Sequence, residues 1–153
     1  MEIISILNKE RIITEFISTT KDGVITELVD SLKDDDSIIN LEKVREVVLE
    51  REKIMSTGIG NGFAIPHGKT NAVKEIVTVF GKLKEAINFD SVDGKPVNLI
   101  FLMVGREDAV SEHIKMLSRI SRIMNKDEVH QKLLKAETAD EILNIFEEEE
   151  SNL

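Results

Sequence analysis

The stretch STGIGNGFAIPHGKT, residues 56–70, holds the residues of this chain that are best suited to chemistry. It contains four glycines and sets His67 directly between Pro66 and Gly68. Because Pro66 restricts its own φ and pushes the preceding residue toward an extended conformation, the backbone entering His67 is stiff. A ring held in this way suits a functional site. On spacing alone, however, a loop histidine without a catalytic role is the simpler interpretation.

Arg51 precedes this stretch, near the end of an amphipathic segment over residues 40–54. On a helical wheel that starts at Leu41, Arg51 falls at about 280°, beside Val44 at about 300° and Val48 at about 340°. Arg51 therefore extends the predicted buried stripe. One interpretation is an anion-binding clamp that reaches inward, and the other is a cation that favours the helix dipole at a C-terminus. The sequence leaves both open.

His113 lies on the apolar face of the clearest predicted helix, residues 108–124. Counted from Val110 it falls at about 300°, between Ile120 and Leu117. A histidine in such a place is most often a core residue with a satisfied hydrogen bond. The third histidine, His130, stands among charged neighbours and is expected at the surface.

Two histidines and an arginine suit an anion site, to which the glycine loop could add backbone N–H donors. The glycine pattern fits neither a Walker A motif nor a dinucleotide fingerprint. No histidine pattern at ligand spacing predicts a metal site, and we expect no cofactor. The chain has no cysteine, which excludes disulfides, thiolate catalysis and thiolate metal sites on it.

Strands and helices alternate along the chain, which favours an α/β layered domain. Apolar runs predict strands at 11–18, 75–83 and 97–105, with an Asp-Gly turn signal between the last two. Helical spacing predicts helices over 21–37, 40–54, 108–124, 127–136 and 138–148. Asn40 is a candidate N-cap, and Thr138 with Glu141 forms a capping-box pattern.

The composition predicts one domain over residues 1–153, with an acidic and frayed tail over 147–153. The net charge of −9 and the absence of Trp and Tyr argue against binding to nucleic acid. Neither a signal peptide nor a membrane-spanning stretch is evident, so a cytoplasmic protein is expected.

These motifs together resemble the EIIA domain of the bacterial sugar phosphotransferase system, in its fructose/mannitol class. The long loop STGIGNGFAIPHGKT carries most of the resemblance. The segments LEREKIMSTGIG, FDSVDGKPVNLIFLMV and SEHIKMLSRISRIM match in the same order, over nearly the whole chain. No functional position departs from the family pattern.

The resemblance implies a mixed β-sheet flanked by helices and a phosphocarrier function in sugar uptake. His67 would accept a phosphoryl group from phospho-HPr, with Arg51 and His113 as its partners. It would then pass the group to a cysteine of EIIB, which must be a separate chain here, and the membrane would be reached only indirectly through EIIC. The sequence identifies neither the sugar nor the phosphorylated ring nitrogen.

Two other functions remain open at this point. The first is a regulatory protein like the nitrogen-related EIIA proteins, which are phosphorylated on the equivalent histidine but act by binding other proteins. The second is a hydrolase or metalloenzyme that uses His67 and His113. If the chain is a phosphocarrier, partner proteins must reach His67, so we expect a shallow exposed site with Phe63 and Met55 as apolar contact residues.

Overall fold

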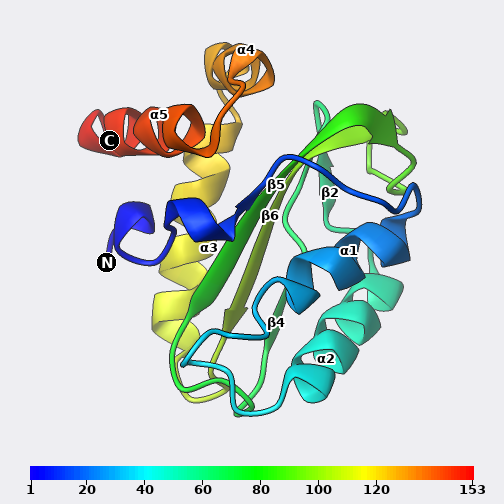
Figure 1. Cartoon of the computed structure of the whole chain (residues 1–153), viewed down its shortest axis with the longest axis vertical. Coiled ribbons are helices and arrows are strands. Elements are labelled where there is room, and N and C mark those ends of the chain that lie inside the picture. The colour runs from blue at the N-terminus through cyan, green and yellow to red at the C-terminus, as the bar shows by residue number, and fades with distance from the viewer.

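The computed structural model describes residues 1–153 and is organised around one mixed sheet of six strands (Figure 1). In spatial order the strands are β1 (Ile12–Ile13), β5 (Val77–Ile87), β6 (Val97–Gly105), β3 (Phe63–Ala64) and β2 (Gly58–Gly60), while β4 (His67–Lys69) also pairs with β6. The long strands β5 and β6 are antiparallel, whereas β1 runs parallel to β5, and β3 and β4 run parallel to β6.

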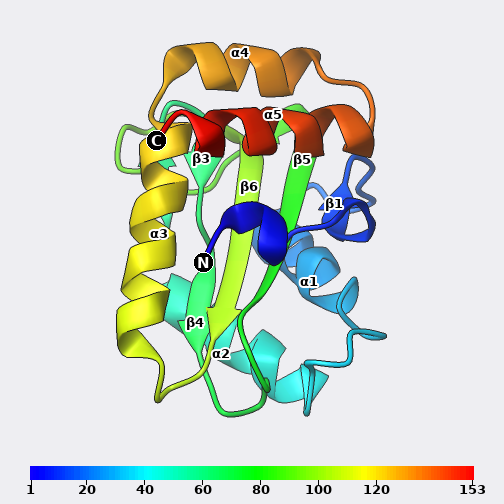
Figure 2. The ribbon, with the colours of Figure 1, turned by 90° about the vertical axis from the view of Figure 1, so that its left-hand side faces the viewer.

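Helices cover both faces of this sheet, so the central strands are apolar on both sides (Figures 1 and 2). On one face α1 (Lys21–Asp30) and α2 (Leu41–Ile54) enclose a core that includes Ile100 and Leu102 of β6. On the other face α3 (Val110–Met124), α4 (Asp127–Lys135) and α5 (Ala139–Ser151) enclose Phe101 and Met103. The expected α/β class, a mixed sheet flanked by helices, is confirmed.

Local capping follows the sequence at two helices. The side chain of Asn40 accepts a hydrogen bond from the N–H of Lys43, and that of Thr138 accepts one from Glu141. The carboxylate of Glu141 reaches back to the N–H of Glu137, so the first turn of α5 is satisfied from both sides.

The predicted strand over 11–18 is shorter than expected, because only Ile12 and Ile13 pair with β5. The N–H groups of Ile17 and Ser18 bond instead to the carboxylate of Glu27 on α1. The predicted helix over 21–37 ends early as well, at Asp30.

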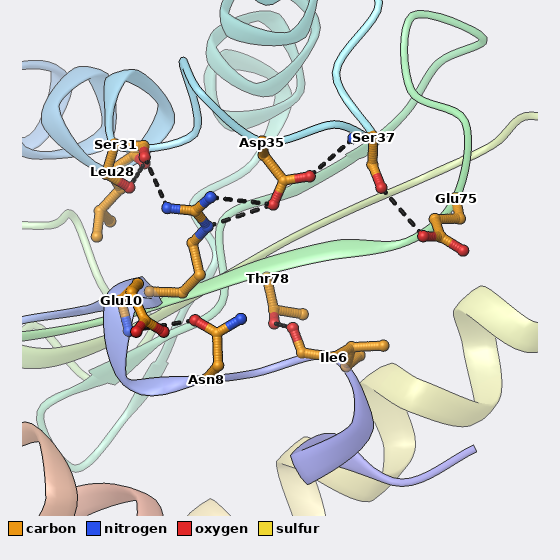
Figure 3. A network of polar contacts seen from close by, with 10 residues as sticks. Ile6, Asn8, Glu10, Leu28, Ser31, Asp35, Ser37, Glu75 and Thr78 are labelled. Atoms are coloured by element: carbon orange, nitrogen blue, oxygen red, sulfur yellow. Dashed lines mark hydrogen bonds and ion pairs between the residues drawn. The ribbon is translucent and has the colours of Figure 1, made fainter.

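A polar network replaces the missing end of that helix (Figure 3). The guanidinium of Arg11 bonds to the carbonyl of Ser31 and to the carboxylate of Asp35. Ser37 bonds to Asp35 through its N–H and to Glu75, just before β5, through its hydroxyl. This network ties the loop after α1 to the N-terminal segment and to the sheet.

The expectation of a frayed acidic tail is wrong for residues 147–150, which lie within α5. Glu149 and Glu150 are buried because each has cationic or backbone partners. The carboxylate of Glu150 accepts hydrogen bonds from the N–H groups of Ile3 and Ile4 and from Arg119. The end of the chain thus holds its beginning in place.

His130 is buried rather than at the surface. Its Nε2 bonds to the carbonyl of Met124 at 2.7 Å, and its ring meets Phe63 edge-on at 6.2 Å. In α4 it lies next to Val129 and near Leu133 on the inner arc of the helix, so the charged neighbours in sequence lie on the opposite face. None of the helices is both long and apolar enough to cross a bilayer.

Candidate functional site

His67 opens the short edge strand β4, which lies between α2 and α3 (Figure 1). Its strand partner on β6 is Met103, whose N–H also bonds to the carbonyl of Pro66 at 3.0 Å. Side chains paired across neighbouring strands point to the same face of a sheet. Because Met103 packs in the core beneath α3, the imidazole of His67 is directed toward α3.

The imidazole of His67 is held by one hydrogen bond, between its Nδ1 and the carbonyl oxygen of Ile65 at 2.7 Å. A carbonyl can only accept, so Nδ1 carries the proton. In the neutral ring Nε2 then bears the lone pair. This second nitrogen has no hydrogen-bond partner and is not enclosed, which leaves it open to an incoming group.

His113 of α3 is only 3% exposed, and its ring centroid lies 5.8 Å from that of His67. The prediction that it faces inward is confirmed, but the expected satisfied hydrogen bond is absent: its Nδ1 is buried without a partner. A proton there would cost about 1–3 kcal/mol in unmet hydrogen bonding, so the neutral ring carries its proton on Nε2. Nε2 of His113 is not enclosed.

Gly105, at the end of β6, makes room for this ring. A Cβ atom added to Gly105 would lie 2.9 Å from Nδ1 of His113. The two histidines are therefore complementary near neutral pH, since the open nitrogen of His67 accepts and that of His113 donates.

Both rings are held in the neutral form. Burial lowers the pKa of His113 to about 4, and the positive charge of Lys69, like any positive charge on His67, acts in the same direction. Burial also lowers the pKa of His67, and the cations Arg51 and Lys69 add to that effect. The hydrogen bond to Ile65 and the negative charge of Glu52 partly oppose the decrease.

Arg51 lies in the last turn of α2, half-buried, where its Nη1 bonds to the carbonyl of Met55 at 3.0 Å. This contact fits the interpretation as a C-terminal cation. It uses only one of the five guanidinium donors, and the charge of Arg51 still acts on His67. Lys69, exposed and two residues after His67 on β4, lies on the same face of the strand.

The glycine-rich stretch forms a β-hairpin and not the open loop of backbone N–H donors that the sequence suggested for an anion site. Strands β2 and β3 are antiparallel, and between them Asn61 and Gly62 adopt φ values of 55° and 80°. The Asn-Gly pair is the local signal for this hairpin, because both residues readily adopt the positive φ that such a turn requires. Gly68 serves close packing, because a Cβ there would lie 2.9 Å from Cγ1 of Val47 on α2.

Sequence reasoning also missed the buried carboxylate of Glu52, which is 4% exposed. On the wheel that starts at Leu41, Glu52 falls at about 20°, within the apolar stripe next to Val48. A carboxylate in that position has to be paired if it is to be buried, and this was the available signal.

The apolar surroundings of the site differ in part from the expectation. The prediction that Phe63 is a contact residue is wrong, because its side chain is 1% exposed and belongs to the core beneath α3. Met55 is 66% exposed, and its neighbours Ile54 and Ile59 are 81% and 42% exposed.

Known proteins resemble this chain over most of its length. The fructose-specific EIIABC component of Bacillus subtilis is 36% identical over 95% of this chain, which spans 23% of that longer protein. The fructose-specific EIIA component of Haloferax volcanii is 33% identical, and the match covers 96% of both chains.

Solved structures of EIIA-type proteins also resemble this chain. The nitrogen regulatory protein IIA-Ntr of Neisseria meningitidis has a TM-score of 0.87 at 32% identity, with coverage of 94% of this chain and 98% of that one. The Escherichia coli complex of IIA mannitol with phosphorylated IIB mannitol has a TM-score of 0.79 at 20% identity. The match covers 93% of this chain and 97% of that one, and it shows a shared fold.

The family model described as "Phosphoenolpyruvate-dependent sugar phosphotransferase system, EIIA 2" matches residues 5–149. This match spans all six strands and every α-helix except the last two residues of α5. The chain therefore belongs to this EIIA family of the sugar phosphotransferase system, whose members are phosphotransfer components.

Proposed function

We propose that this chain is a phosphohistidine carrier that accepts a phosphoryl group from phospho-HPr on Nε2 of His67. It passes the group to the cysteine of EIIB during carbohydrate uptake. The observation that carries the proposal is the hydrogen bond from Nδ1 of His67 to Ile65, which leaves Nε2 as an unprotonated and open nucleophile. Such a role belongs in the cytoplasm, with EIIC as the membrane component.

The transfer needs no general base. The lone pair on Nε2 forms the new N–P bond as the bond between phosphorus and the donor's ring nitrogen breaks. The proton on Nδ1 stays in its bond to Ile65, so the phosphorylated ring is cationic and remains a good leaving group. In the second step a thiolate of EIIB forms the S–P bond, the N–P bond breaks, and the neutral imidazole returns.

Arg51, His113 and Lys69 stabilise the charge that moves with the phosphoryl group. In a loose transition state this charge is spread over three equatorial oxygens. The free guanidinium donors of Arg51 suit two such oxygens, and Nε2–H of His113 suits a third. Lys69 adds a positive charge on the same face.

A regulatory function is the second candidate, and the similarity to IIA-Ntr of Neisseria meningitidis favours it. Phosphorylation of His67 would then control the binding of another protein. Both candidates use the same nucleophile, and they differ in the fate of the phosphoryl group. A hydrolase is less well supported, because the chain belongs to a family of phosphotransfer components.

Labelled phosphoenolpyruvate, enzyme I and HPr test the first step, and added EIIB chains test the second. We expect acid-labile label on the wild type and none on His67→Ala. Label that persists in His67→Ala would exclude this assignment. Passage of label to an EIIB supports transport, whereas label that no EIIB accepts, together with phosphorylation-dependent binding of another protein, supports regulation. Phosphate release without any partner would instead indicate a hydrolase.

A further inference from the structure

Glu52 is a buried carboxylate at the end of α2 that the transfer chemistry above does not use. Its Oε2 accepts a hydrogen bond from the N–H of Thr57 at 2.6 Å, and its Oε1 accepts one from the hydroxyl of the same residue. Lys21 of α1 supplies the compensating charge, with Nζ 3.4 Å from Oε2. The carboxylate is thus paired with a cation and holds one residue by two bonds.

Thr57 closes the β2–β3 hairpin at its open end. Its carbonyl accepts a hydrogen bond from the N–H of Ile65 at 3.0 Å. Ile65 in turn presents the carbonyl that holds Nδ1 of His67 at 2.7 Å. An unbroken series of contacts therefore runs from Lys21 and Glu52 through Thr57 and Ile65 to the imidazole.

Two neighbouring residues in the last turn of α2 face different parts of the site. Consecutive helical residues point about 100° apart. Arg51 is half-buried and its charge acts on His67, whereas Glu52 points into the interior and holds the hairpin. The same helix end thus supplies the cation near His67 and the anchor of the carbonyl that orients the ring.

A buried carboxylate is an expensive way to fill a core position. Its burial costs free energy that its partners only offset, and apolar residues of similar volume often serve stability equally well. A two-pronged acceptor does what an apolar side chain cannot, because it fixes both the position and the rotation of Thr57. Its geometric specificity points to a role beyond packing.

We propose that Glu52 is a positioning residue for phosphoryl transfer: through Thr57 and Ile65 it holds His67 in the tautomer and orientation that aim Nε2 outward. This rests on the proposed function, in which Nε2 of His67 is the nucleophile. Loss of the anchor would let the Ile65 carbonyl move and the imidazole sample its other tautomer, whose Nε2 is protonated and cannot attack.

The experiment uses Glu52→Gln, Glu52→Ala, Thr57→Val and Thr57→Ser in the full chain. Glu150→Gln is the matched control, because Glu150 is also a buried carboxylate that accepts two hydrogen bonds and pairs with a cation, but at the chain termini. Two quantities are measured for each: the rate of transfer from phospho-HPr per folded molecule, and the nitrogen-15 shifts of the His67 ring, which report its tautomer.

We expect transfer to fall by about tenfold or more in Glu52→Ala, as for a small misplacement of a reacting group. The transfer rate should fall less in Thr57→Val and Glu52→Gln. The ring shifts of all three variants should show a mixture of tautomers. Thr57→Ser should restore wild-type values, because it keeps both donors. Glu150→Gln should lose stability but keep both the transfer rate and the tautomer.

Wild-type ring shifts and rates in Thr57→Val and Glu52→Gln would overturn the proposal, even if Glu52→Ala failed to fold. If Glu150→Gln changed the transfer rate and the ring shifts as much as Glu52→Gln does, the proposal would also be overturned. The changes would then follow from a general loss of stability and not from the contact of Glu52 with Thr57. A wild-type chain that takes no label would refute the proposed function instead. The ring shifts would still decide whether Glu52 orients His67.

Discussion

At the scale of single residues, the two histidines use the same kind of ring in opposite ways. Each keeps Nδ1 against the protein, His67 in a bond to Ile65 and His113 beside Gly105. The bond makes Nδ1 of His67 a donor, whereas enclosure without a partner leaves Nδ1 of His113 unprotonated. One open nitrogen therefore presents a lone pair and the other presents an N–H, provided that both rings stay neutral.

The depressed pKa of His113 predicts a loss of stability in acid. Between its folded pKa of about 4 and its usual value of 6.5, the unfolded chain binds a proton that the folded chain does not. Stability from this group is therefore fully present above pH 6.5 and is lost as the pH falls toward about 4. In His113→Gln the decrease in unfolding free energy between about pH 7 and pH 5 should be smaller than in the wild type, by roughly 2 kcal/mol.

Urea titrations of both proteins at the two pH values measure this difference. Other titrating groups are common to both chains and largely cancel. Equal decreases would show that His113 is not held neutral by the fold.

Arg51→Lys tests the geometry of the cation. The charge is retained, but the two-pronged donor is lost, so transfer from phospho-HPr should slow by about tenfold, or about 1.4 kcal/mol of barrier. The melting temperature should change little. Arg11→Lys is a matched control, because Arg11 also donates to a backbone carbonyl but pairs with Asp35 and has no contact with His67. Normal transfer with a large loss of stability in Arg51→Lys would make Arg51 purely structural.

At the scale of elements, the site depends on how closely α2 approaches β4. Gly68 permits this approach, since a Cβ would lie 2.9 Å from Cγ1 of Val47. Gly68→Ala should therefore push β4 from α2, cost about 1–3 kcal/mol in stability and slow transfer at the adjacent His67. The double variant Gly68→Ala/Val47→Ala removes the clash and should recover much of the lost transfer rate. A double variant as slow as Gly68→Ala would show that the clash is not the cause.

Periodicity predicted the helices and long strands well because each buries a regular apolar stripe or face. It also placed Arg51 and His113 on inward faces, whereas the site as a whole was reached by resemblance. Periodicity failed where a polar group is buried with a partner distant in sequence. Glu52 depends on Lys21, Glu150 on Ile3 and Arg119, and such pairings appear only once the chain has folded. Short strands such as β4 were missed because their hydrogen bonds go to β6 and leave little local pattern.

At the scale of the whole molecule, the site combines local cations with a strongly acidic chain. The net charge is −9, yet Arg51 and Lys69 act together on His67. The end of α2 and the following hairpin also leave Ile54, Met55 and Ile59 exposed beside Arg51. We expect a protein that presents a phosphoryl group to Nε2 to approach over this surface, with apolar contacts that are made only during the encounter.

Ile54→Asp tests that surface. Ile54 is 81% exposed, so its replacement should leave the fold, the His67 ring shifts and the melting temperature unchanged. A negative charge at the contact should nevertheless weaken the encounter with a phosphorylated donor and lower the second-order rate of transfer by about tenfold. Ile17→Asp is the matched control, because Ile17 is 95% exposed and lies just before α1, in another part of the sequence from the hairpin. If the two variants transfer equally fast, the donor docks elsewhere and reaches His67 without touching the end of α2. If only Ile54→Asp is slow while its phosphorylated form is as stable as the wild type, the exposed apolar residues act in docking and not in the chemistry of the ring.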